Sequence, residues 1–487
     1  MKYAQEESSA LFTDYYSLTM AQGYWKKKIS SRAVFEMFFR SQPFNGGFSV
    51  FAGLGTLLEK LQKLTFSADD LNYLSSLGIF EDAFLDYLKN FRFSGSLWAM
   101  EEGTVVFPNE PLIRVDGNHI ECQLIEGLLL NTINFQSLIA TKTARVWLAS
   151  NMGSLMEFGL RRAQGPDGAL SASRAAYIGG AQGTSNVLAG KKFGIPLFGT
   201  MAHSWVMSWP SEEEAFRAYA EIYPESTVFL IDTYDTLNSG IVNAIKVGKT
   251  LAAKGKNFGI RLDSGDIHYL SAEARKRLDE AGLTKAFISV SNDLDETIIH
   301  ALTAAKAPIN SWGVGTRMVT GGNEASFNGV YKLAASEDET NEKLAARIKF
   351  SDNPEKTSNP GVKQVWRITD RAGMYVVDVL TLDDVNEQDH LEIGKSYSFW
   401  HPSADYRRFT HTLDGEIKPL LRLRLLNGKS QEKEPSLKEI QAYLGRELEA
   451  LDQSYKRILN PHIYKVSISQ KLKSLKLDLI KNYLGEG

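Results

Sequence analysis

The sequence predicts an α/β fold whose middle part is built from parallel strands, arranged either as a closed barrel or as a wound sheet. Three observations support this prediction. Short apolar segments alternate with helical stretches between residues 154 and 315, and polar residues gather where the apolar segments end. The length of 487 residues also leaves room for two or three domains.

The apolar segments have the length and composition of strands that are buried on both faces. They occupy residues 154–159, 195–199, 227–232, 258–263, 286–291 and 309–315. Stretches with helical periodicity, such as 237–254 and 267–282, lie between them. A repeat of roughly 25–40 residues is typical of successive βα units.

Polar residues follow each of the six predicted strands. They are Glu157, Arg161 and Arg162; Thr200 and His203; Asp232 and Asp235; Arg261, Asp263 and Asp266; Asn292 and Asp293; and Gly313, Gly315 and Thr316. Parallel barrels build their active sites from the loops at the carboxyl ends of the strands. The sequence therefore predicts one constructed site at this rim.

The flanking segments predict mixed α+β structure. Residues 31–40 are expected to form a strand, residues 103–117 a hairpin with Pro and Gly turns, and a helix is expected to begin after Ser67. Strands are also expected around 331–339 and 374–382, beside a turn-rich stretch. Residues 434–457 predict an amphipathic helix with a solvated charged face. We expect an N-terminal α+β domain over 1–150, a barrel over 151–330, and a C-terminal region over 331–487 that packs partly on the N-terminal domain.

Composition excludes several classes of protein. A net charge of −3, from 55 basic and 58 acidic residues, argues against a nucleic-acid binder. The single cysteine, Cys122, allows neither an intrachain disulfide nor a cysteine zinc site. The start MKYAQEESSALF lacks the features of a signal peptide, and no apolar run of about 18 residues predicts a membrane span. We expect a cytoplasmic protein.

The strongest local motif is FGIRLDSGDIHYL at residues 258–270. Arg261 offers a planar fork that matches a carboxylate or phosphate, and Asp263 and Asp266 have the chemistry to bind ribose hydroxyls or hydrated Mg²⁺. The alternative is structural: Asp266 caps a helix, and Arg261 and Asp263 satisfy each other. The presence of an arginine beside the cap favours a functional site.

A second motif, INSWGVGTRMVTGG at residues 309–322, is rich in glycine. Gly313, Gly315 and Thr316 would let backbone N–H groups approach a phosphate. The motif is neither a Walker A loop nor GxGxxG, and by itself it fits an ordinary turn as well as a phosphate site. Its place after the last strand, where barrels often bind phosphate, favours the phosphate site.

Three further stretches contain candidate residues. MEFGLRRAQGPDGALSASRAAYIGGAQGTSN at 156–186 supplies Phe158 for stacking on a flat ring, with Arg161 for anions. In SVSNDLDE, Asp293 is a site candidate and Asp295 a helix cap. In LFTDYYSLTMAQGYW, a helix capped by Thr13 or Asp14, the pattern favours Tyr15 and Tyr16 as core or interface residues. No HExxH or GxSxG motif is present. The basic groups, the carboxylates and the glycine-rich turn at the rim together suit a sugar phosphate or nucleotide.

These motifs together resemble the nicotinate phosphoribosyltransferase family. The matching stretches include LFTDYYSLTMAQGYW, EFGLRRA, GGAQGTSNVLAG, GTMAHSWVMSW, IRLDSGD, VSNDLDE, GVGTRMVTG, KFSDNPEKTSNPGVKQVWR (349–367) and NPHIYKVSIS (460–469), in that order. The resemblance implies a type II phosphoribosyltransferase fold, which is an irregular α/β barrel with an α+β domain from both chain ends. It also implies a homodimer with active sites at the subunit interface.

The resemblance further implies a reaction and its cosubstrates. Nicotinate and 5-phosphoribosyl 1-pyrophosphate would give nicotinate mononucleotide and pyrophosphate, with Mg²⁺ present and ATP hydrolysis coupled to turnover. His203 would be the histidine that ATP phosphorylates. The residues near nicotinate and the ribose pyrophosphate would be Tyr16 (from the partner subunit), Phe158, Arg161, Thr200, Arg261 and Asp263. Those at the 5-phosphate would be Asp293, Gly313, Gly315 and Thr316. A basic loop with Lys349, Lys356, Lys363 and Arg367 is expected to reach the phosphates.

One position bears on the choice of pyridine. Related nicotinamide enzymes carry an aspartate where this chain has Ser185, after Gly-Thr in GGAQGTSN. A carboxylate there would repel the carboxylate of nicotinate, whereas a hydroxyl donates a hydrogen bond to it. Nicotinate is the expected substrate. The alternatives are a nicotinamide- or quinolinate-specific phosphoribosyltransferase and a non-catalytic nucleotide-binding protein.

Overall fold

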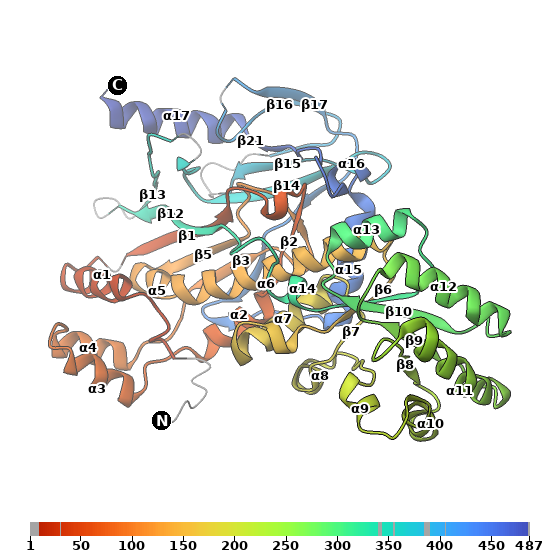
Figure 1. Cartoon of the computed structure of the whole chain (residues 1–487). Coiled ribbons are helices and arrows are strands. Elements are labelled where there is room, and N and C mark those ends of the chain that lie inside the picture. The colour runs from red at the N-terminus through yellow and green to blue at the C-terminus, as the bar shows by residue number, and fades with distance from the viewer. Residues whose placement is uncertain are drawn as a thin grey trace. The chain divides into compact units, whose positions relative to one another are not determined.

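The chain forms two compact units in the computed structural model (Figure 1). The structure describes residues 9–29, 31–338, 343–353, 356–383, 390–404 and 406–485. Residues 139–325 make up the central unit, and residues 1–138 with 326–487 make up the flanking unit. Residues 1–8, 339, 354 and 355 belong to stretches used in the predictions above but lie outside the described residues. The domain boundaries at 150 and 330 stay a prediction.

The central unit contains one sheet of six parallel strands. Their spatial order is β7 (Gly183–Thr184), β6 (Ser154–Glu157), β11 (Ser311–Val314), β10 (Phe287–Asn292), β9 (Gly259–Leu262) and β8 (Val228–Leu230). Because the order ends at β7 and β8, the sheet is an open, irregular barrel rather than a closed one. The carboxyl ends of all six strands lie at the same edge, where the sequence places its polar residues.

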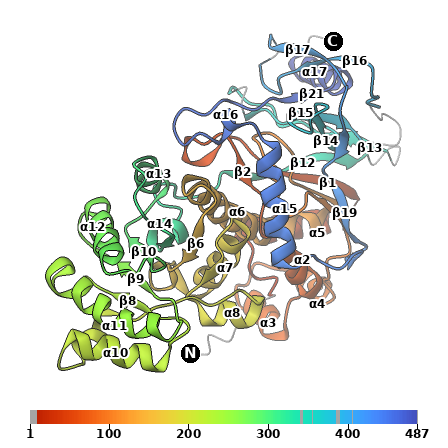
Figure 2. The same cartoon turned by 90° about the vertical axis from the view of Figure 1, so that its right-hand side faces the viewer.

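Helices connect these strands and cover the sheet. They are η2 (Leu160–Arg162), α7 (Gly165–Ile178), α8 (Val187–Phe193), α9 (His203–Met207), α10 (Glu212–Ile222), η3 (Thr236–Gly240), α11 (Ile241–Ala253), α12 (Ile267–Glu280), α13 (Glu296–Ala304) and α14 (Thr316–Val319). Helix α12 packs against β9 and β10, and α7 packs against β6 and β7 (Figure 2). A helical crossover is the usual link between neighbouring parallel strands.

Five of the six predicted strands are present, and the prediction for residues 195–199 is wrong. Leu197 makes only an isolated bridge with Thr184. Pro196 has no N–H to donate to a ladder, although its carbonyl accepts a hydrogen bond from Thr184 N at 3.0 Å. The short strand β7 provides the edge of the sheet instead.

The flanking unit contains two larger sheets and a two-stranded one. The first sheet has the order β13 (Leu344–Ala346), β12 (Gly329–Glu337), β1 (Arg32–Phe39), β5 (Ile113–Asn118), β3 (Ser96–Ala99), β19 (Arg422–Leu426) and β20 (Lys429–Ser430). The second has the order β17 (Arg408–Thr412), β16 (Ser396–Trp400), β21 (Val466–Ile468), β15 (Tyr375–Leu382), β14 (Lys363–Thr369) and β18 (Ile417–Pro419). The small sheet pairs β2 (Ser49–Val50) with β4 (Val105–Val106). Both chain ends therefore contribute to this α+β unit.

The helices that begin in the flanking part of the sequence complete the element list. They are α1 (Tyr15–Lys26), η1 (Pro43–Asn45), α2 (Leu54–Lys63), α3 (Ala68–Ser76), α4 (Asp82–Lys89), α5 (His119–Leu124), α6 (Glu126–Ala149), α15 (Leu437–Ala450), α16 (Gln453–Lys456) and α17 (Gln470–Leu484). Ser67 caps α3 through a capping box, as predicted. Asp14 stands at the N-cap position of α1 without a side-chain capping bond.

The predicted hairpin at 103–117 is wrong. Strand β4 pairs with β2, whereas β5 pairs with β1 and β3 in another sheet. The turn residues between them are held from elsewhere: Asn109 N donates to Phe39 O at 2.7 Å, and Phe107 N donates to the buried Glu110 carboxyl at 3.1 Å. A Pro-containing turn thus redirects the chain between two sheets instead of folding it back.

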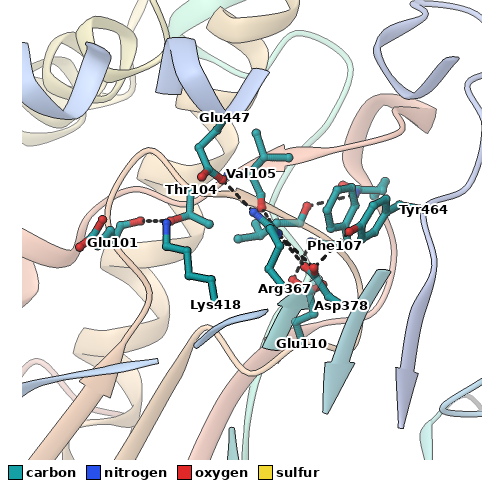
Figure 3. A network of polar contacts seen from close by, with 12 residues as sticks. Glu101, Thr104, Val105, Phe107, Glu110, Arg367, Asp378, Lys418, Glu447 and Tyr464 are labelled. Carbon is teal, nitrogen blue, oxygen red and sulfur yellow. Dashed lines mark hydrogen bonds and ion pairs between the residues drawn. The ribbon is translucent and has the colours of Figure 1, made fainter. Parts of the chain in front are cut away.

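Strand β14 contains a buried ionic network (Figure 3). Arg367, whose side chain is 2% exposed, binds Asp378 at 2.6 Å, Glu447 at 2.8 Å and Val105 O at 2.7 Å. Glu447 comes from α15, so this position of the predicted solvated helix face is buried instead. Lys363 on the same strand binds Glu36 at 2.8 Å.

These ion pairs correct part of the predicted phosphate-binding loop. Lys363 and Arg367 are buried, and their charges are already compensated by carboxylates within the flanking unit. The expected contact of these two residues with phosphate is therefore wrong. Lys349 and Lys356 are exposed, and their contact with phosphate stays a prediction.

Candidate active site at the carboxyl ends of the parallel strands

The end of β9 brings an arginine and an aspartate to the rim of the central unit. Arg261 Nη1 donates a hydrogen bond to Thr200 Oγ1, and Arg261 Nη2 lies 3.9 Å from Asp263 Oδ1. Arg261 Nε is buried and has no hydrogen-bond partner among the described residues. The guanidinium is therefore oriented by its neighbours, while the hydrogen-bonding capacity of one donor is not met by the described residues.

Asp232, just after β8, organises the loop that follows Arg261. Its Oδ2 accepts hydrogen bonds from Asp263 N at 3.1 Å and from Ser264 Oγ at 2.5 Å. Its Oδ1 is buried without a partner in the described part of the chain. Ser291 Oγ, from β10, donates to Asp263 Oδ1. Three neighbouring strand ends thus hold the Asp263 carboxylate in place.

His203 begins α9 and lies beside the same carboxylate. Its Nδ1 is 3.1 Å from Thr233 Oγ1, and its Nε2 is 3.8 Å from Asp263 Oδ2. The imidazole is partly exposed. When Nδ1 carries the proton and donates to Thr233, Nε2 keeps its lone pair and faces the side where Asp263 lies.

Burial lowers the pKa of Arg261, and the Asp263 and Asp232 carboxylates partly offset this effect. Arg161 contributes in the same direction as burial, which places a second positive charge near Arg261. A desolvated guanidinium with an open donor and a cationic neighbour favours the binding of an anion. This electrostatic setting is what a phosphate or pyrophosphate group requires.

Phe158 packs closely against Gly313 near the end of β11 and Gly315 just after it. A Cβ on Gly313 would come within 2.6 Å of the Phe158 ring, and a Cβ on Gly315 within 3.1 Å of the Phe158 carbonyl oxygen. Phe158 N also donates to Val314 O at 2.8 Å. Glycine at 313 therefore allows the aromatic ring to lie against the strand end, which the sequence analysis had interpreted only as room for phosphate.

Ser185 is joined to the same region through the backbone. Its N–H donates to Glu157 O at 3.0 Å, and the side chain is half-buried. Asp293 and Thr316 are exposed after β10 and at the start of α14. The structure thus brings His203, Thr200, Arg261 and Asp263 together by direct contacts, and places Phe158 against Gly313.

Other polar residues at the rim have structural roles. Asp266 caps α12 by accepting from Tyr269 N, so the structural alternative applies to this residue. Asp295 caps α13, as predicted, and Asp235 caps η3. The side-chain oxygens of these three aspartates satisfy N–H groups that would otherwise lack partners at the helix starts.

Tyr16 belongs to α1 of the flanking unit. Its side chain is 48% exposed, so it is not a core residue, and its hydroxyl donates to Glu126 Oε2 at 3.3 Å. Burial and the Glu126 charge raise the pKa of Tyr16. Its predicted contact with the pyridine stays a prediction.

Sequence reasoning missed several residues of the site. Ser291 and Thr233 hold Asp263 and His203, and Asp232 had been placed on the rim without a role. Their signal was position alone, because each lies within three residues of a strand end. In the flanking unit, the pattern also gave no sign of Lys332, whose pKa burial lowers; the Glu126 charge opposes this shift, and the charges of Arg40 and Lys349 add to it.

Two structural features are absent from the described residues. No set of three or more His, Cys, Asp or Glu side chains there is arranged to hold a metal ion. Across the same residues, no helix combines the length and the apolar character needed to cross a membrane.

Models of one family match almost the whole chain. The nicotinate phosphoribosyltransferase N-terminal domain matches residues 11–134, the nicotinate phosphoribosyltransferase family matches 154–382, and the nicotinate phosphoribosyltransferase C-terminal domain matches 362–476. Nicotinate phosphoribosyltransferase of Bacillus subtilis is 43% identical over 487 residues, covering 98% of this chain and 96% of the relative. The human protein of that name is 33% identical, covering 97% of each chain.

Solved structures agree in fold. The crystal structure of human nicotinic acid phosphoribosyltransferase matches with a TM-score of 0.83 at 31% identity, covering 96% of this chain and 99% of the other. The nicotinate-nucleotide pyrophosphorylase of Pyrococcus furiosus matches with a TM-score of 0.70 at 22% identity, covering 92% and 97%. The second match supports the fold alone. The predicted fold class, an irregular α/β barrel with an α+β domain from both chain ends, is confirmed.

Proposed function

The chain belongs to the nicotinate phosphoribosyltransferase family, and on that premise we propose that it converts nicotinate and 5-phosphoribosyl 1-pyrophosphate into nicotinate mononucleotide and pyrophosphate. The observation that carries this proposal is the group at the rim, in which Arg261 contacts both Thr200 and Asp263, and Asp263 lies beside His203. Arg261 Nε and Asp232 Oδ1 are buried without partners among the described residues, and this unmet hydrogen-bonding capacity supports a charged ligand at this group.

The pyridine would bind between aromatic rings. Phe158, packed against Gly313, provides one face, and Tyr16 of the partner subunit would provide the other. Ser185 would donate a hydrogen bond to the carboxylate of nicotinate. A pyridine that leaves the Ser185 hydroxyl without a hydrogen-bond partner would bind less well, so nicotinate is the expected substrate.

The phosphoribosyl group would extend along the strand ends. Arg261, Arg161 and Thr200 would hold the pyrophosphate and the ribose, and the lowered pKa of the desolvated Arg261 fits an anionic partner. The 5-phosphate would lie at the loops with Asp293, Gly313, Gly315 and Thr316. Exposed Lys349 and Lys356 of the flanking unit are further candidates for phosphate contacts.

The chemistry is a displacement at the anomeric carbon. The pyridine nitrogen forms the new bond to C1 as the bond from C1 to the pyrophosphate oxygen breaks. The ribose gains positive charge in the transition state, and the Asp263 carboxylate, held by Ser291 and the Asp263 N–H contact with Asp232, would offset it. The nitrogen is unprotonated near neutral pH, so the reaction requires positioning and electrostatics rather than a strong base.

Magnesium would enter with the pyrophosphate. Mg²⁺ is usually bound by one or two carboxylates together with substrate phosphates, and the open Asp232 Oδ1 beside Asp263 fits this pattern. When bound, the ion neutralises the charge of the leaving group.

His203 would couple ATP to turnover. Thr233 at Nδ1 orients the ring so that Nε2 is the nucleophile toward the γ-phosphoryl group of ATP. The bond from Nε2 to phosphorus forms as the bond to ADP breaks, and water later releases phosphate. Asp263, 3.8 Å from Nε2, connects this step to the ribose site.

A homodimer would complete the site. Helix α1 and the residues before it expose Phe12, Tyr15, Tyr16 and Met20, which is more apolar surface than a solvated helix needs. Burying these side chains against a second copy would bring Tyr16 to the partner's Phe158. The buried free Cys122 is in keeping with the cytoplasmic location that we propose.

One assay tests this function. Protein, Mg²⁺, 5-phosphoribosyl 1-pyrophosphate and ATP are mixed with nicotinate, nicotinamide or quinolinate, and the mononucleotide and ADP are quantified. We expect product from nicotinate with a strong preference over nicotinamide. No product from any pyridine would contradict the proposal and favour a nucleotide-binding protein.

A variant tests the role of His203. His203→Ala is expected to abolish the stimulation by ATP and the phosphoenzyme, while slow synthesis without ATP continues. Full stimulation in this variant would show that His203 is only a neighbour of the chemistry. The size of the protein in solution, compared with Tyr16→Ser, tests the dimer.

A further inference from the structure

Glu157, the last residue of β6, is a buried carboxylate whose role the reaction above does not use. It is 1% exposed. Its Oε1 accepts a hydrogen bond from Gly159 N, and its Oε2 accepts from Ser173 Oγ at 2.9 Å and from Thr184 Oγ1 at 2.5 Å. These three donors come from the loop after β6, from α7 and from β7.

The donors are themselves aligned by a fourth residue. Asn186 N donates to Thr184 Oγ1 at 2.9 Å, and Asn186 Nδ2 donates to Ser173 Oγ at 3.2 Å. The Thr184 hydroxyl can therefore turn its own proton toward Glu157, whereas the single proton of Ser173 is shared between Glu157 and Ala169 O, which lies at 3.0 Å. Asn186 also caps α8 through Ala189 N, so the carboxylate ends two short relays of hydrogen bonds.

The network encloses both residues that the proposed function assigns to the pyridine. Phe158 stands between Glu157 and Gly159 in the chain, and Ser185 stands between Thr184 and Asn186. The backbone adds a further link, because Ser185 N donates to Glu157 O at 3.0 Å. Both sides of the Glu157 residue, main chain and side chain, are therefore tied to the loop of Ser185.

Glu157 differs from Glu296, another buried glutamate of the central unit, in the kind of groups that bind its carboxylate. Glu296 binds Lys142 at 2.5 Å and Arg145 at 3.0 Å, so it joins two cationic side chains at the start of α13. The donors to Glu157 are a backbone amide and two hydroxyls, each one residue away from a pyridine contact or on the helix behind it. Hydroxyl and amide donors fix direction more than they compensate charge.

We propose that Glu157 is a positioning residue that sets the distance and angle between the Phe158 ring and the Ser185 hydroxyl, and so determines the affinity and selectivity for the pyridine carboxylate. This inference rests on the proposed function. It assigns to Glu157 no contact with substrate. A binding site for a small flat ligand is sensitive to shifts of about 1 Å, because every contact must be made at once.

The test separates nicotinate binding from turnover. Thr184→Val keeps the shape of Thr184 but removes the hydroxyl that donates to Glu157, and Glu157→Gln replaces one acceptor by an amide that faces two hydroxyl donors. We expect KM for nicotinate to rise by about tenfold or more, kcat to change by less than about threefold, and the preference for nicotinate over nicotinamide to fall. KM for 5-phosphoribosyl 1-pyrophosphate is expected to stay the same.

Two further variants control for folding. Thr184→Ser keeps the hydroxyl and is expected to recover most of the nicotinate affinity lost in Thr184→Val. Ser154→Ala removes a hydroxyl that donates to Gln182 at 2.8 Å at the opposite end of β6, and is expected to leave the kinetics unchanged. Thermal unfolding identifies any variant that does not fold, and calorimetric titration with nicotinate measures binding without turnover.

The outcomes distinguish the inference from the function on which it rests. If Thr184→Val folds and keeps both its nicotinate KM and its selectivity, Glu157 is only structural and the inference is wrong. An equal rise in KM for nicotinate and for 5-phosphoribosyl 1-pyrophosphate would also contradict the inference. If the unaltered protein makes no mononucleotide, the proposed function fails. The titrations then decide the inference. Weaker nicotinate binding by Thr184→Val than by the unaltered protein supports it. Equal binding by the two proteins, or no binding by the unaltered protein, contradicts it.

Discussion

The arginine clusters of the two units differ in whether their hydrogen-bonding groups are all used. In the flanking unit, the Arg367 guanidinium binds Asp378, Glu447 and a backbone carbonyl (Figure 3). In the central unit, Arg261 binds Thr200, stands 3.9 Å from Asp263, and has a buried Nε for which the described part of the chain supplies no hydrogen-bond partner. The same type of side chain is fully paired within the fold in one place, whereas in the other it has an unpaired donor to which the proposed function assigns a ligand.

The difference has a physical basis in desolvation. A buried guanidinium without full compensation costs free energy, and a protein retains that cost where a ligand offsets it. Carboxylates raise the pKa of Arg367 despite its burial, whereas burial prevails over the carboxylates and lowers the pKa of Arg261. Substitutions should therefore reduce stability in the flanking unit and activity in the central unit.

The largest effect is expected from Arg367→Met. The substitution leaves the buried Asp378 and Glu447 carboxylates without their cation, which is expected to lower the free energy of unfolding by about 3–5 kcal/mol. Urea unfolding measures the change. The matched control is Arg371→Met, which removes an exposed pair with Asp414 and should cost less than about 1 kcal/mol. Similar losses in both variants would show that the network is not a major source of stability.

Asp263→Asn is expected to have the opposite profile. The amide keeps the shape but loses the charge that would offset the positive ribose, so kcat should fall by about 100-fold, or about 2.7 kcal/mol. The free energy of unfolding should change by less than about 1 kcal/mol, because the side chain is partly exposed. Steady-state kinetics and urea unfolding measure the two quantities. If Asp263→Asn lost much stability but kept its kcat, substitutions in the central unit would not act on activity as expected.

Ser185→Asp tests selectivity at the rim. A carboxylate at this position should lower kcat/KM for nicotinate by at least about tenfold, or about 1.4 kcal/mol, and shift the preference toward nicotinamide. Ser185→Ala is the control, since it removes the donor without adding charge and should weaken nicotinate binding less. If nicotinate is favoured as strongly by Ser185→Asp as by the unaltered protein, Ser185 does not select the substrate.

The smallest effect concerns Glu110, beside Asp378 in the network. Burial, followed by the Asp378 charge, raises the pKa of Glu110 well above its ordinary value of 4.5. A raised acid pKa means that folding favours the protonated form, so its contribution is complete at low pH and declines as pH rises through the folded-state pKa. One such group changes the free energy of unfolding by at most about 1.4 kcal/mol per pH unit.

Glu110→Gln should remove this decline. The amide is neutral at every pH, so the free energy of unfolding of the variant is expected to fall less steeply with rising pH than that of the unaltered protein. Urea unfolding at several pH values above 4.5 compares the two slopes. Parallel slopes would show that Glu110 is not protonated in the folded protein.

The central unit was largely predictable from the sequence, for reasons visible in particular elements. Apolar strands such as β8 to β10 are short, continuous and followed at once by polar residues, so pattern alone placed Arg261 and Asp263 at the rim. The role of His203 depended on the resemblance to a family, because nothing in its neighbours distinguishes a reactive histidine from a structural one.

The errors have identifiable physical causes. Pro196 interrupts the ladder of a segment whose composition is that of a strand, and the turn around Asn109 sends β4 and β5 to different sheets. Lys363 and Arg367 are part of a turn-rich, charged sequence that is typical of exposed loops. Their burial depends on ion pairs with Glu36, Asp378 and Glu447. These partners lie elsewhere in the sequence, so no local pattern predicts the pairing.

The most direct test is whether Arg261 binds the ligand and Arg367 only stabilises the fold. It compares binding of 5-phosphoribosyl 1-pyrophosphate to Arg261→Lys and Arg367→Lys. Both substitutions keep the positive charge and remove the planar fork. In calorimetric titrations with Mg²⁺, we expect Arg261→Lys to bind at least about tenfold more weakly than the unaltered protein, because its open donor and bidentate geometry are lost. Arg367→Lys should be less stable but bind with unchanged affinity. Equal affinity in Arg261→Lys, or lost binding in folded Arg367→Lys, would contradict the account.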